Sequence, residues 1–430
     1  MLEIEIGHLV RVRCLAAGFP VARRMSMPDL ALHRPWARRK HGPMMDLRLT
    51  NSDLADLTDW RRALHQRPEV SGDEAETART VHKMLEPTAP DRIVTGLGGH
   101  GVAALYDSGK PGPCVLLRCE LDGLPIQELS DRPHRSQFDG KGHLCGHDGH
   151  MAMLAGMARL LGRRRPARGS VVLMFQPAEE TGEGAARVVA DPGFAAFRPD
   201  YAFAIHNFPG MPLGHVGVVD GPASCASRGV RVRLTGRTAH ASQPETGLSP
   251  APALARLMLD LPGLSQGADL SDPDFALVTI CHARLGEPAF GIAPGEAELY
   301  ATLRSLTDPG MEALIARAEA LTRETAGDLG LAIDYHDIFP ACTNTPVAAE
   351  IVRRAGARAG LPTGPGLLPM RPSEDFGHFG MATGAESAFI LLGAGRDGPD
   401  LHNPDYDFPD DLIGPGTALF GEILREILGD

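Results

Sequence analysis

The sequence predicts an α/β protein in which a mixed-sheet domain is interrupted by a smaller, ferredoxin-like α+β domain. Three observations lead to this fold class. Near-continuous apolar runs, typical of strands buried on both faces of a parallel sheet, occur at residues 114–122, 170–180 and 201–208. Polar residues stand at the end of each run, which is where open α/β sheets build their sites. Between residues 224 and 338 the pattern becomes strand–helix–strand–strand–helix–strand, the order of a ferredoxin-like domain.

Composition narrows the classes of function. The chain has 430 residues, 43% hydrophobic and 22% charged, which is enough for two domains with large cores. A net charge of -12 argues against nucleic acid or an anionic membrane as a partner. No apolar run approaches the roughly 20 residues of a membrane-spanning helix. Seven scattered cysteines without a C-x-x-C pair indicate a reducing compartment, so we expect a cytoplasmic protein.

The elements follow from hydrophobic periodicity. The first half predicts helices at 54–65 and 74–85, strands at 102–107 and 114–122, a helix at 150–161, and strands at 170–180 and 201–208. The interrupting part predicts strands and helices in the order 228–236, 250–261, 275–285, 296–306, 310–328 and 331–339. The α/β pattern then resumes with a helix at 346–359, a strand at 386–394 and a last helix at 412–428.

The first 44 residues differ from the rest. They carry eight Lys and Arg against three acids, and no sustained apolar stretch that would suit a secretory signal. We interpret them as a disordered extension, or as the product of an upstream start with Met44 or Met45 as the true beginning. A basic targeting arm is the alternative.

The stretch HLCGHDGH at residues 143–150 is the centre of the functional argument. Cys145 and His147 stand at C-x-H spacing, where one bend of backbone aims both side chains at one metal ion. The alternative is a structural cysteine beside a surface histidine. His150 is better explained as a packing or supporting residue.

Other chemistry-bearing residues follow the buried strands. Glu179 and Glu180 end one strand, and adjacent side chains there point to different sides, so one can bind metal while the other acts as a general base. His206 follows another strand, and His402 lies in a loop rich in Pro and Asp. Alone, the glutamates could be a solvated pair and each histidine structural; together they favour a metal site.

Three further residues are candidates. Asp122 lies two residues after Glu120 at a strand end and could orient a ligand histidine, or instead form a salt bridge. His240 lies in the interrupting part and could stabilise an oxyanion, or be an ordinary loop histidine. Arg304, on a strand of that part, could bind a substrate carboxylate bidentately, or form a salt bridge on the sheet surface.

From about Trp60 to the C-terminus the chain resembles the bacterial N-acyl-amino-acid amidohydrolases and hippurate hydrolases. This family includes plant auxin-conjugate hydrolases and belongs to the aminoacylase and carboxypeptidase clan of dinuclear metallohydrolases. The resemblance rests on the motifs LHQRPEVSGDE, ELDGLPIQE, CGHDGHMAMLAG, FQPAEETGEGA, IHNFPGMPLGHVGV, GRTAHAS, FGIAPGEAELYATLR, SEDF and LHNPDYDF.

The resemblance implies a Zn-peptidase-like catalytic domain at 45–223 and 339–430, and an inserted lid or dimerisation domain at 224–338. It implies two divalent ions, Zn²⁺ or Mn²⁺ first and Co²⁺ or Ni²⁺ as options, held by Cys145, His147, Glu180, His206 and His402. It also implies roles for Glu179 as the base that activates water, for Asp122 as an orienting carboxylate, and for His240 as a transition-state contact, often from a partner subunit of a homodimer.

The chain departs from the family pattern at three positions. Glu120 stands where the family usually has aspartate, Glu245 replaces a histidine, and Gly291 replaces an asparagine that the family uses near its substrate. The expected activity is hydrolysis of N-acyl or N-aroyl amino acids. A dipeptidase or aryl-amine hydrolase on the same scaffold is one alternative, and a metal-dependent binding protein without turnover is another, which the intact Glu179 argues against.

Overall fold

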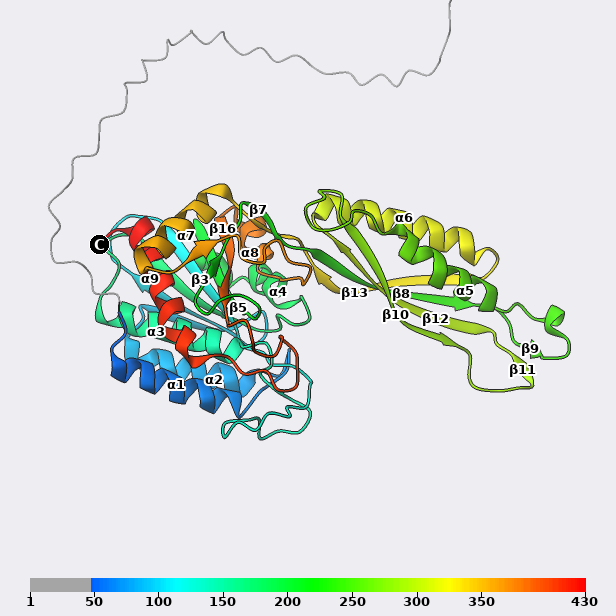
Figure 1. Ribbon diagram of the computed structural model, residues 1–430, viewed down its shortest axis with the longest axis horizontal. Helices are drawn as coiled ribbons and strands as arrows, with labels where there is room; N and C mark the ends of the chain where they lie inside the picture. Colours follow the sequence, from blue (N-terminus) through cyan, green and yellow to red (C-terminus); the bar gives the residue numbers. More distant parts are fainter. Residues whose placement is uncertain (1–47) are drawn as a thin grey trace, which may run out of the picture. The chain divides into compact units, whose positions relative to one another are not determined.

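The computed structural model describes residues 48–430, so the interpretations of residues 1–44 lie outside the described part of the chain. Two sheets with their helices account for most of this range (Figure 1). The first sheet has eight strands and is mixed, and the second has four antiparallel strands. The predicted fold class is therefore confirmed. The domain boundaries proposed from the sequence stay a prediction.

The eight-stranded sheet has the order β1-β2-β4-β3-β5-β16-β6-β15. Its strands are β1 (Arg92–Leu97), β2 (Gly101–Asp107), β4 (Ser170–Gln176), β3 (Cys114–Glu120), β5 (Tyr201–Phe208), β16 (Glu386–Gly393), β6 (Val216–Gly217) and β15 (Thr363–Gly364). The central strands β4, β3, β5 and β16 run parallel to one another. Their carboxyl ends therefore meet at one edge of the sheet, where the candidate residues were expected.

Helices cover both faces of this sheet. One face packs against α1 (Asn51–His65), α2 (Ala75–Leu85), α3 (His147–Arg163), α7 (Pro346–Ala359) and α9 (Ile413–Leu428). The other packs against α4 (Gly184–Ala190), the short helix Phe194–Phe197 and α8 (Gly377–Thr383). Alternate residues of one strand serve the two cores: Leu117 faces the first set of helices and Leu116 the second, and both are fully buried. This explains the apolar runs, because both faces of each central strand are covered.

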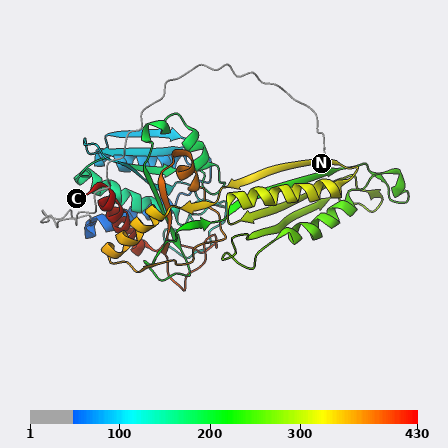
Figure 2. The same ribbon diagram turned by 90° about the horizontal axis from the view of Figure 1, so that it is seen from above.

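The four-stranded sheet has the order β10-β12-β8-β13. Its strands are β8 (Ala226–Thr235), β10 (Ala276–Leu285), β12 (Glu296–Ser305) and β13 (Gly330–Phe339). Two helices, α5 (Ala251–Asp260) and α6 (Asp308–Ala326), lie on one face of this sheet (Figure 2). A short ribbon of β9 (Ala239–His240) and β11 (Ile292–Ala293) extends beyond it, and β7 (Gly221–Ser224) pairs with β14 (Cys342–Asn344) where the chain enters and leaves this part.

Two predicted elements differ in ways that matter for the site. The helix expected at 150–161 begins at His147, so His147 and His150 both lie in its first turn. The strand expected at 170–180 ends at Gln176, because Pro177 cannot donate to the ladder and Ala178 has a positive φ of 50°. The prediction of one strand reaching Glu180 was therefore wrong beyond Gln176.

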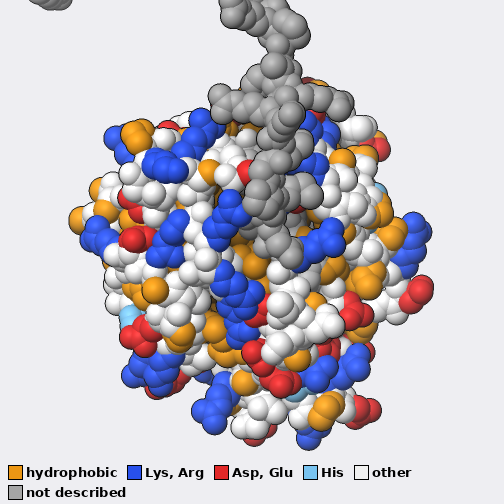
Figure 3. Space-filling model, turned by 90° about the vertical axis from the view of Figure 1, so that its left-hand side faces the viewer, with side chains coloured by type: hydrophobic (Ala, Val, Ile, Leu, Met, Phe, Trp, Pro, Cys, Tyr) orange, Lys and Arg blue, Asp and Glu red, His pale blue; other side chains and the backbone are white. Residues whose placement is uncertain are grey.

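The surface carries charges of both signs. On the face in Figure 3, basic, acidic and apolar side chains are interspersed. The ion pair of Arg358 with the half-buried Glu422 joins α7 to α9. None of the helices within residues 48–430 combines the length and the apolar character that a membrane crossing requires.

Candidate metal centre

The candidate site lies at the carboxyl edge of the parallel strands. Asp122 follows β3, Glu179 and Glu180 follow β4, and His206 lies near the end of β5. The first turn of α3 brings His147 to the same edge. The loop at 401–408 adds His402, whose backbone N–H donates to the carbonyl oxygen of Leu144 at 2.8 Å. Segments far apart in the sequence thus converge at one place.

Cys145, His147 and His206 form a compact group of metal donors, with one ligand atom of each lying within 4.8 Å of the others. The Sγ atom of Cys145 lies 3.4 Å from Nε2 of His206. Each histidine donates its Nδ1–H to a carbonyl oxygen, His147 to that of Asp122 at 2.8 Å and His206 to that of Asn207 at 2.7 Å. These bonds fix the orientation of both rings and leave the unprotonated Nε2 atom of each ring as the one that can bind a metal.

A second group consists of Cys145, Glu180 and His402, and shares Cys145 with the first. Nε2 of His402 lies 3.6 Å from Oε2 of Glu180. Nε2 of His147 and Oε1 of Glu180 are buried and, within residues 48–430, have no hydrogen-bond partner. Buried polar atoms normally have a partner. These two atoms lie 3.8 Å apart, so one metal ion between them would satisfy both. Soft thiolate, imidazole and carboxylate donors fit a divalent transition metal.

The charges of the site lead to the same conclusion. Burial raises the pKa of the Cys145 thiol and of the Glu179 carboxyl well above their usual values, and that of Glu180 to about 7. Burial opposes a charge on His147, but Glu120 and the neighbouring carboxylates outweigh it and raise the pKa of His147 to about 10. A buried group of acids is stable only with added positive charge, which a divalent cation supplies.

Gly146 makes the close spacing of Cys145 and His147 possible. It has a φ of 92°, and a Cβ atom there would lie 2.2 Å from Oδ1 of Asn207. Only glycine combines this backbone conformation with such a close approach. The C-x-H spacing therefore depends on the residue between the two donors.

Asp122 supports the centre through several contacts. Its carbonyl oxygen accepts the hydrogen bond from His147, and its Oδ1 atom lies 3.5 Å from the same Nδ1. Its Oδ2 atom accepts from the hydroxyl of Ser71 at 2.7 Å and from the backbone N–H of Glu180 at 3.1 Å. Asp122 thus connects two of the donor segments.

Glu120, the first departure from the family pattern, is fully buried. Its Oε2 atom accepts from Nδ1 of His150 at 2.6 Å, and Nε2 of His150 accepts from the backbone N–H of Asn207 at 3.0 Å. Arg118, also fully buried, pairs with Glu120, Glu374 and Asp375. His150 is therefore a supporting residue whose position depends on Glu120.

A second buried ion cluster lies behind His147. Asp148 forms an ion pair with Arg61, whose Nε lies 2.7 Å from its Oδ2, and accepts from Nδ1 of His65 at 2.8 Å. Nε2 of His65 lies 3.3 Å from Oε1 of Glu128. Arg61 also pairs with Asp407, in the loop that carries His402. The cluster therefore ties α1 to the start of α3 and to that loop.

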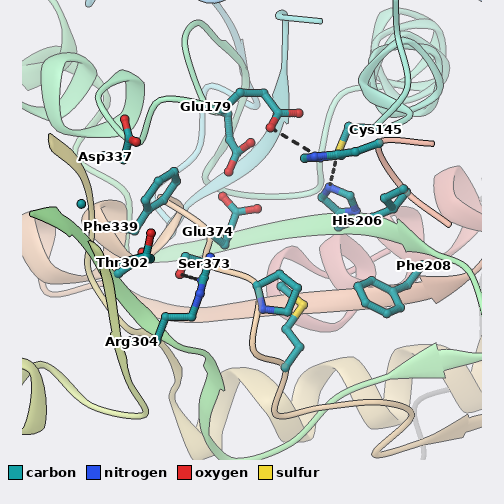
Figure 4. A pocket seen from close by; sticks show the side chains of 17 residues that line it. Cys145, Glu179, His206, Phe208, Thr302, Arg304, Asp337, Phe339, Ser373 and Glu374 are labelled. Carbon is teal, nitrogen blue, oxygen red and sulfur yellow. Dashed lines mark hydrogen bonds and ion pairs between the residues drawn. The ribbon is translucent and has the colours of Figure 1, made fainter. Parts of the chain in front are cut away.

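A pocket of about 280 Å³ opens beside the donors (Figure 4). Glu179 and His206 face this space, and so does Glu374, with Arg304 and Ser373 at its edge. The wall opposite the donors comes from the four-stranded sheet. Arg304, on β12, donates from Nη1 to the Ser373 hydroxyl at 2.8 Å and to the Arg371 carbonyl at 3.0 Å. The pocket brings together the donors, the candidate base and one cation.

His240 is the candidate that does not join this group. It is exposed on β9, where it pairs with Ile292, and it is not among the residues that line the pocket. The other two departures lie near it. Glu245 is exposed in the adjoining turn, and the carbonyl oxygen of Gly291 accepts from the backbone N–H of Ala241 at 3.0 Å.

Sequence reasoning missed two carboxylates beside the candidate base. Glu374 and Asp375 are buried, and their carboxylates lie within 4.8 Å of that of Glu179. After burial, Glu374 is the strongest influence that raises the pKa of Glu179. The motif SEDF contains both residues, so an acidic pair within a motif shared with the resembling family was the available signal.

The fold and the site define the chain as a metal-dependent hydrolase of linear amides. Residues 116–426 match the model of peptidase family M20/M25/M40, and the chain belongs to this family. It is 27% identical to an N-acetylcysteine deacetylase of Bacillus subtilis over 86% of this chain and 97% of that protein. It is 26% identical to the hippurate hydrolase of Campylobacter jejuni over 86% and 95% of the two chains.

Among solved structures, the chain is similar to the YXEP protein of Bacillus subtilis, which is described as a dinuclear metal-binding peptidase of the M20 family. The TM-score is 0.75 at 25% identity, over 88% of this chain and 99% of that one. The similarity therefore spans both sheets.

Proposed function

We propose that this protein hydrolyses the amide bond of N-acyl or N-aroyl amino acids, with two divalent cations and Glu179 as general base. The observation that carries the proposal is the meeting of Cys145, His147, Glu180, His206 and His402 beside a pocket that Glu179 faces. The names of the similar proteins, a deacetylase and a hippurate hydrolase, support the substrate class.

The five donors would hold the cations, with Cys145 common to both groups. When bound, the cations supply Lewis-acid activation of water and of the substrate carbonyl. Zn²⁺ and Mn²⁺ are the first choices and Co²⁺ or Ni²⁺ also suit this donor set, because affinity order alone does not select the metal in a cell.

We assign the proton transfers to Glu179. Its side chain is 7% exposed, lines the pocket, and brings Oε2 to 3.9 Å from Nε2 of His147. Burial raises its pKa, as the base of a hydrolytic reaction near neutral pH requires. Glu179 accepts the proton of the attacking water and returns it to the leaving nitrogen. Asp122 holds His147 and the backbone of Glu180 in place during both transfers.

Arg304 is the proposed partner of the substrate carboxylate. One of its terminal nitrogens is used by Ser373 and Arg371, and within residues 48–430 its Nη2 and Nε have no hydrogen-bond partner. A guanidinium with free donors on a pocket wall binds a carboxylate. This assignment explains why the substrate would be an acylated amino acid rather than a simple amide.

His240 completes the proposal only in an oligomer. It is exposed and lies outside the pocket of its own chain. We propose a homodimer in which the partner contributes this histidine to stabilise the oxyanion. Two inactive variants, His240→Ala and Glu179→Gln, should then regain activity when they are mixed. In a mixed dimer, the pocket of the His240→Ala subunit has its own intact Glu179 and receives the intact His240 of the partner subunit.

The decisive experiment measures hydrolysis of hippurate and of N-acetyl-amino acids. Enzyme stripped with a chelator would be reloaded separately with Zn²⁺, Mn²⁺ and Co²⁺. We expect cleavage to return with metal, and Glu179→Gln to keep its metal content while losing roughly 10²- to 10⁴-fold in rate. Cleavage of dipeptides or aryl amides alone would favour the alternative substrates. Full turnover by Glu179→Gln would remove the base assignment.

A further inference from the structure

Glu74 is a buried carboxylate that none of the roles above uses. It is 0% exposed and lies immediately before α2. Its Oε1 atom accepts two backbone N–H groups, from Gly72 at 2.8 Å and from Ala178 at 2.8 Å. The second bond crosses from the α1–α2 connection to the end of β4, directly before Glu179.

Ala178, which donates the second of these bonds, has an unusual backbone conformation. It is 2% exposed and has a φ of 50°, a left-handed conformation that residues with a Cβ atom rarely adopt. Its carbonyl oxygen accepts from the backbone N–H of Gly184 at 3.0 Å. The conformation of Ala178 sets the direction in which Glu179 and Glu180 leave the strand, and strained backbone at a site persists only when its surroundings hold it.

Helix capping does not explain Glu74. A carboxylate at the start of a helix commonly accepts the free N–H groups of the first turn. In α2 this role belongs to Glu69, whose Oε2 atom accepts from the backbone N–H of Thr77 at 2.7 Å and from its hydroxyl at 2.9 Å. The side chain of Glu74 makes no such bond to its own helix.

We propose that Glu74 is a positioning residue for the turn at residues 177–180, which carries Glu179 and Glu180. By accepting the N–H of Ala178, Glu74 holds the left-handed backbone conformation of that residue. This conformation directs Glu179 into the pocket and Glu180 toward the other metal-binding side chains. This inference rests on the proposed function of those two glutamates. The same connection also holds Asp122 through Ser71, so one loop supports the ends of both β3 and β4.

The test compares four variants of the metal-loaded enzyme. Glu74→Ala removes the acceptor, and we expect kcat to fall about 100-fold because a displacement near 1 Å of a catalytic group has that effect. Glu74→Gln keeps an oxygen acceptor and should stay within about threefold of wild type. In Glu74→Ala with Ala178→Gly, glycine adopts the left-handed conformation without help, so kcat should recover at least about tenfold. Glu69→Ala, the matched control, should lower the thermal midpoint while keeping kcat within about twofold.

The visible absorption of Co²⁺-loaded enzyme gives a readout that needs no substrate. It should shift in Glu74→Ala, because Glu180 is carried by the same turn, and stay unchanged in Glu74→Gln and Glu69→Ala. If wild type cleaves no acyl-amino acid, the proposed function fails, and the absorption still decides the positioning role. Should Glu74→Ala not fold, Glu74→Asp, shorter by one methylene, replaces it with the same expected spectral shift.

Three results would overturn the proposal. One is a folded Glu74→Ala with wild-type kcat and spectrum. Another is a Glu74→Gln as slow as Glu74→Ala, which would mean that the charge matters and the hydrogen bond does not. The third is a double variant no faster than Glu74→Ala.

Discussion

Raising the pH should weaken the fold through His65. Burial disfavours the charged ring, but the carboxylates of Asp148 and Glu128 outweigh burial and raise the pKa of His65 from 6.5 to about 9. The folded state therefore binds a proton that the unfolded chain releases between these two pH values. The stabilisation is fully present below pH 6.5 and is lost as the pH rises through about 9.

The magnitude follows from the size of the shift. One pKa unit corresponds to about 1.4 kcal/mol, so the change from 6.5 to about 9 is worth roughly 3 kcal/mol. The side chain of His65 is 0% exposed, so solvent does not screen this contribution appreciably. Against a total free energy of unfolding of about 5–15 kcal/mol, such a loss is readily measured.

The assay is urea unfolding of the metal-loaded enzyme at a series of pH values from 6 to about 9.5. The matched variant is His65→Gln, which keeps hydrogen-bonding capacity but carries no charge. We expect the free energy of unfolding to fall with pH in wild type and to fall by about 3 kcal/mol less in the variant. Parallel curves for the two proteins, or a wild-type curve that rises across this range, would refute the reasoning.

Three further predictions concern residues around the pocket and the centre. Arg304→Ala should raise KM for an N-acetyl-amino acid about 10- to 100-fold with little change in kcat, because a charged hydrogen bond is worth about 1.5–3 kcal/mol. The KM for the matching N-acetyl-amino acid amide, which lacks the carboxylate, should not change. An equal effect on both substrates would contradict the assignment of Arg304 to the substrate carboxylate. Arg118→Met should lower the free energy of unfolding by about 3–5 kcal/mol, because it leaves Glu120, Glu374 and Asp375 buried without their cation; a urea midpoint like that of wild type would contradict this. Glu120→Asp, whose side chain is one methylene shorter, should lose the hydrogen bond to His150 and lower the free energy of unfolding by about 1–3 kcal/mol. Unchanged thermal unfolding would show that the position of His150 does not depend on Glu120.

The sheet edge could be predicted because it depends on local patterns. Apolar runs marked β3, β4 and β5 as buried, and parallel strands place their carboxyl ends together. Asp122 and Glu179, at the ends of two of those runs, were therefore expected at this edge without a structure, and they lie there. The C-x-H spacing predicted for a similar reason that Cys145 and His147 lie close together, since its geometry is local; their role as metal ligands stays a proposal.

Other features depend on contacts that no local pattern contains. The left-handed conformation of Ala178 is held by Glu74, more than a hundred residues earlier, so the sequence predicted an unbroken strand there. The pairing of Asp148 with His65 likewise joins two helices. The exposed position of His240 depends on the pairing of β9 with β11, which hydrophobic periodicity does not predict.

The convergence of Cys145 and His402 has a consequence for synthesis of the protein. Chains grow from the N-terminus, and domains generally fold as they emerge. The four-stranded sheet, whose residues 226–339 lie between these donors, can form on the ribosome while the second donor group is still incomplete. The loop at 401–408 supplies both His402 and the partner of Arg61, Asp407, only after residues 226–339 have been made. A chain that stops before residue 401 therefore lacks one member of the second donor group, and we expect it to lack hydrolytic activity even when both sheets have formed.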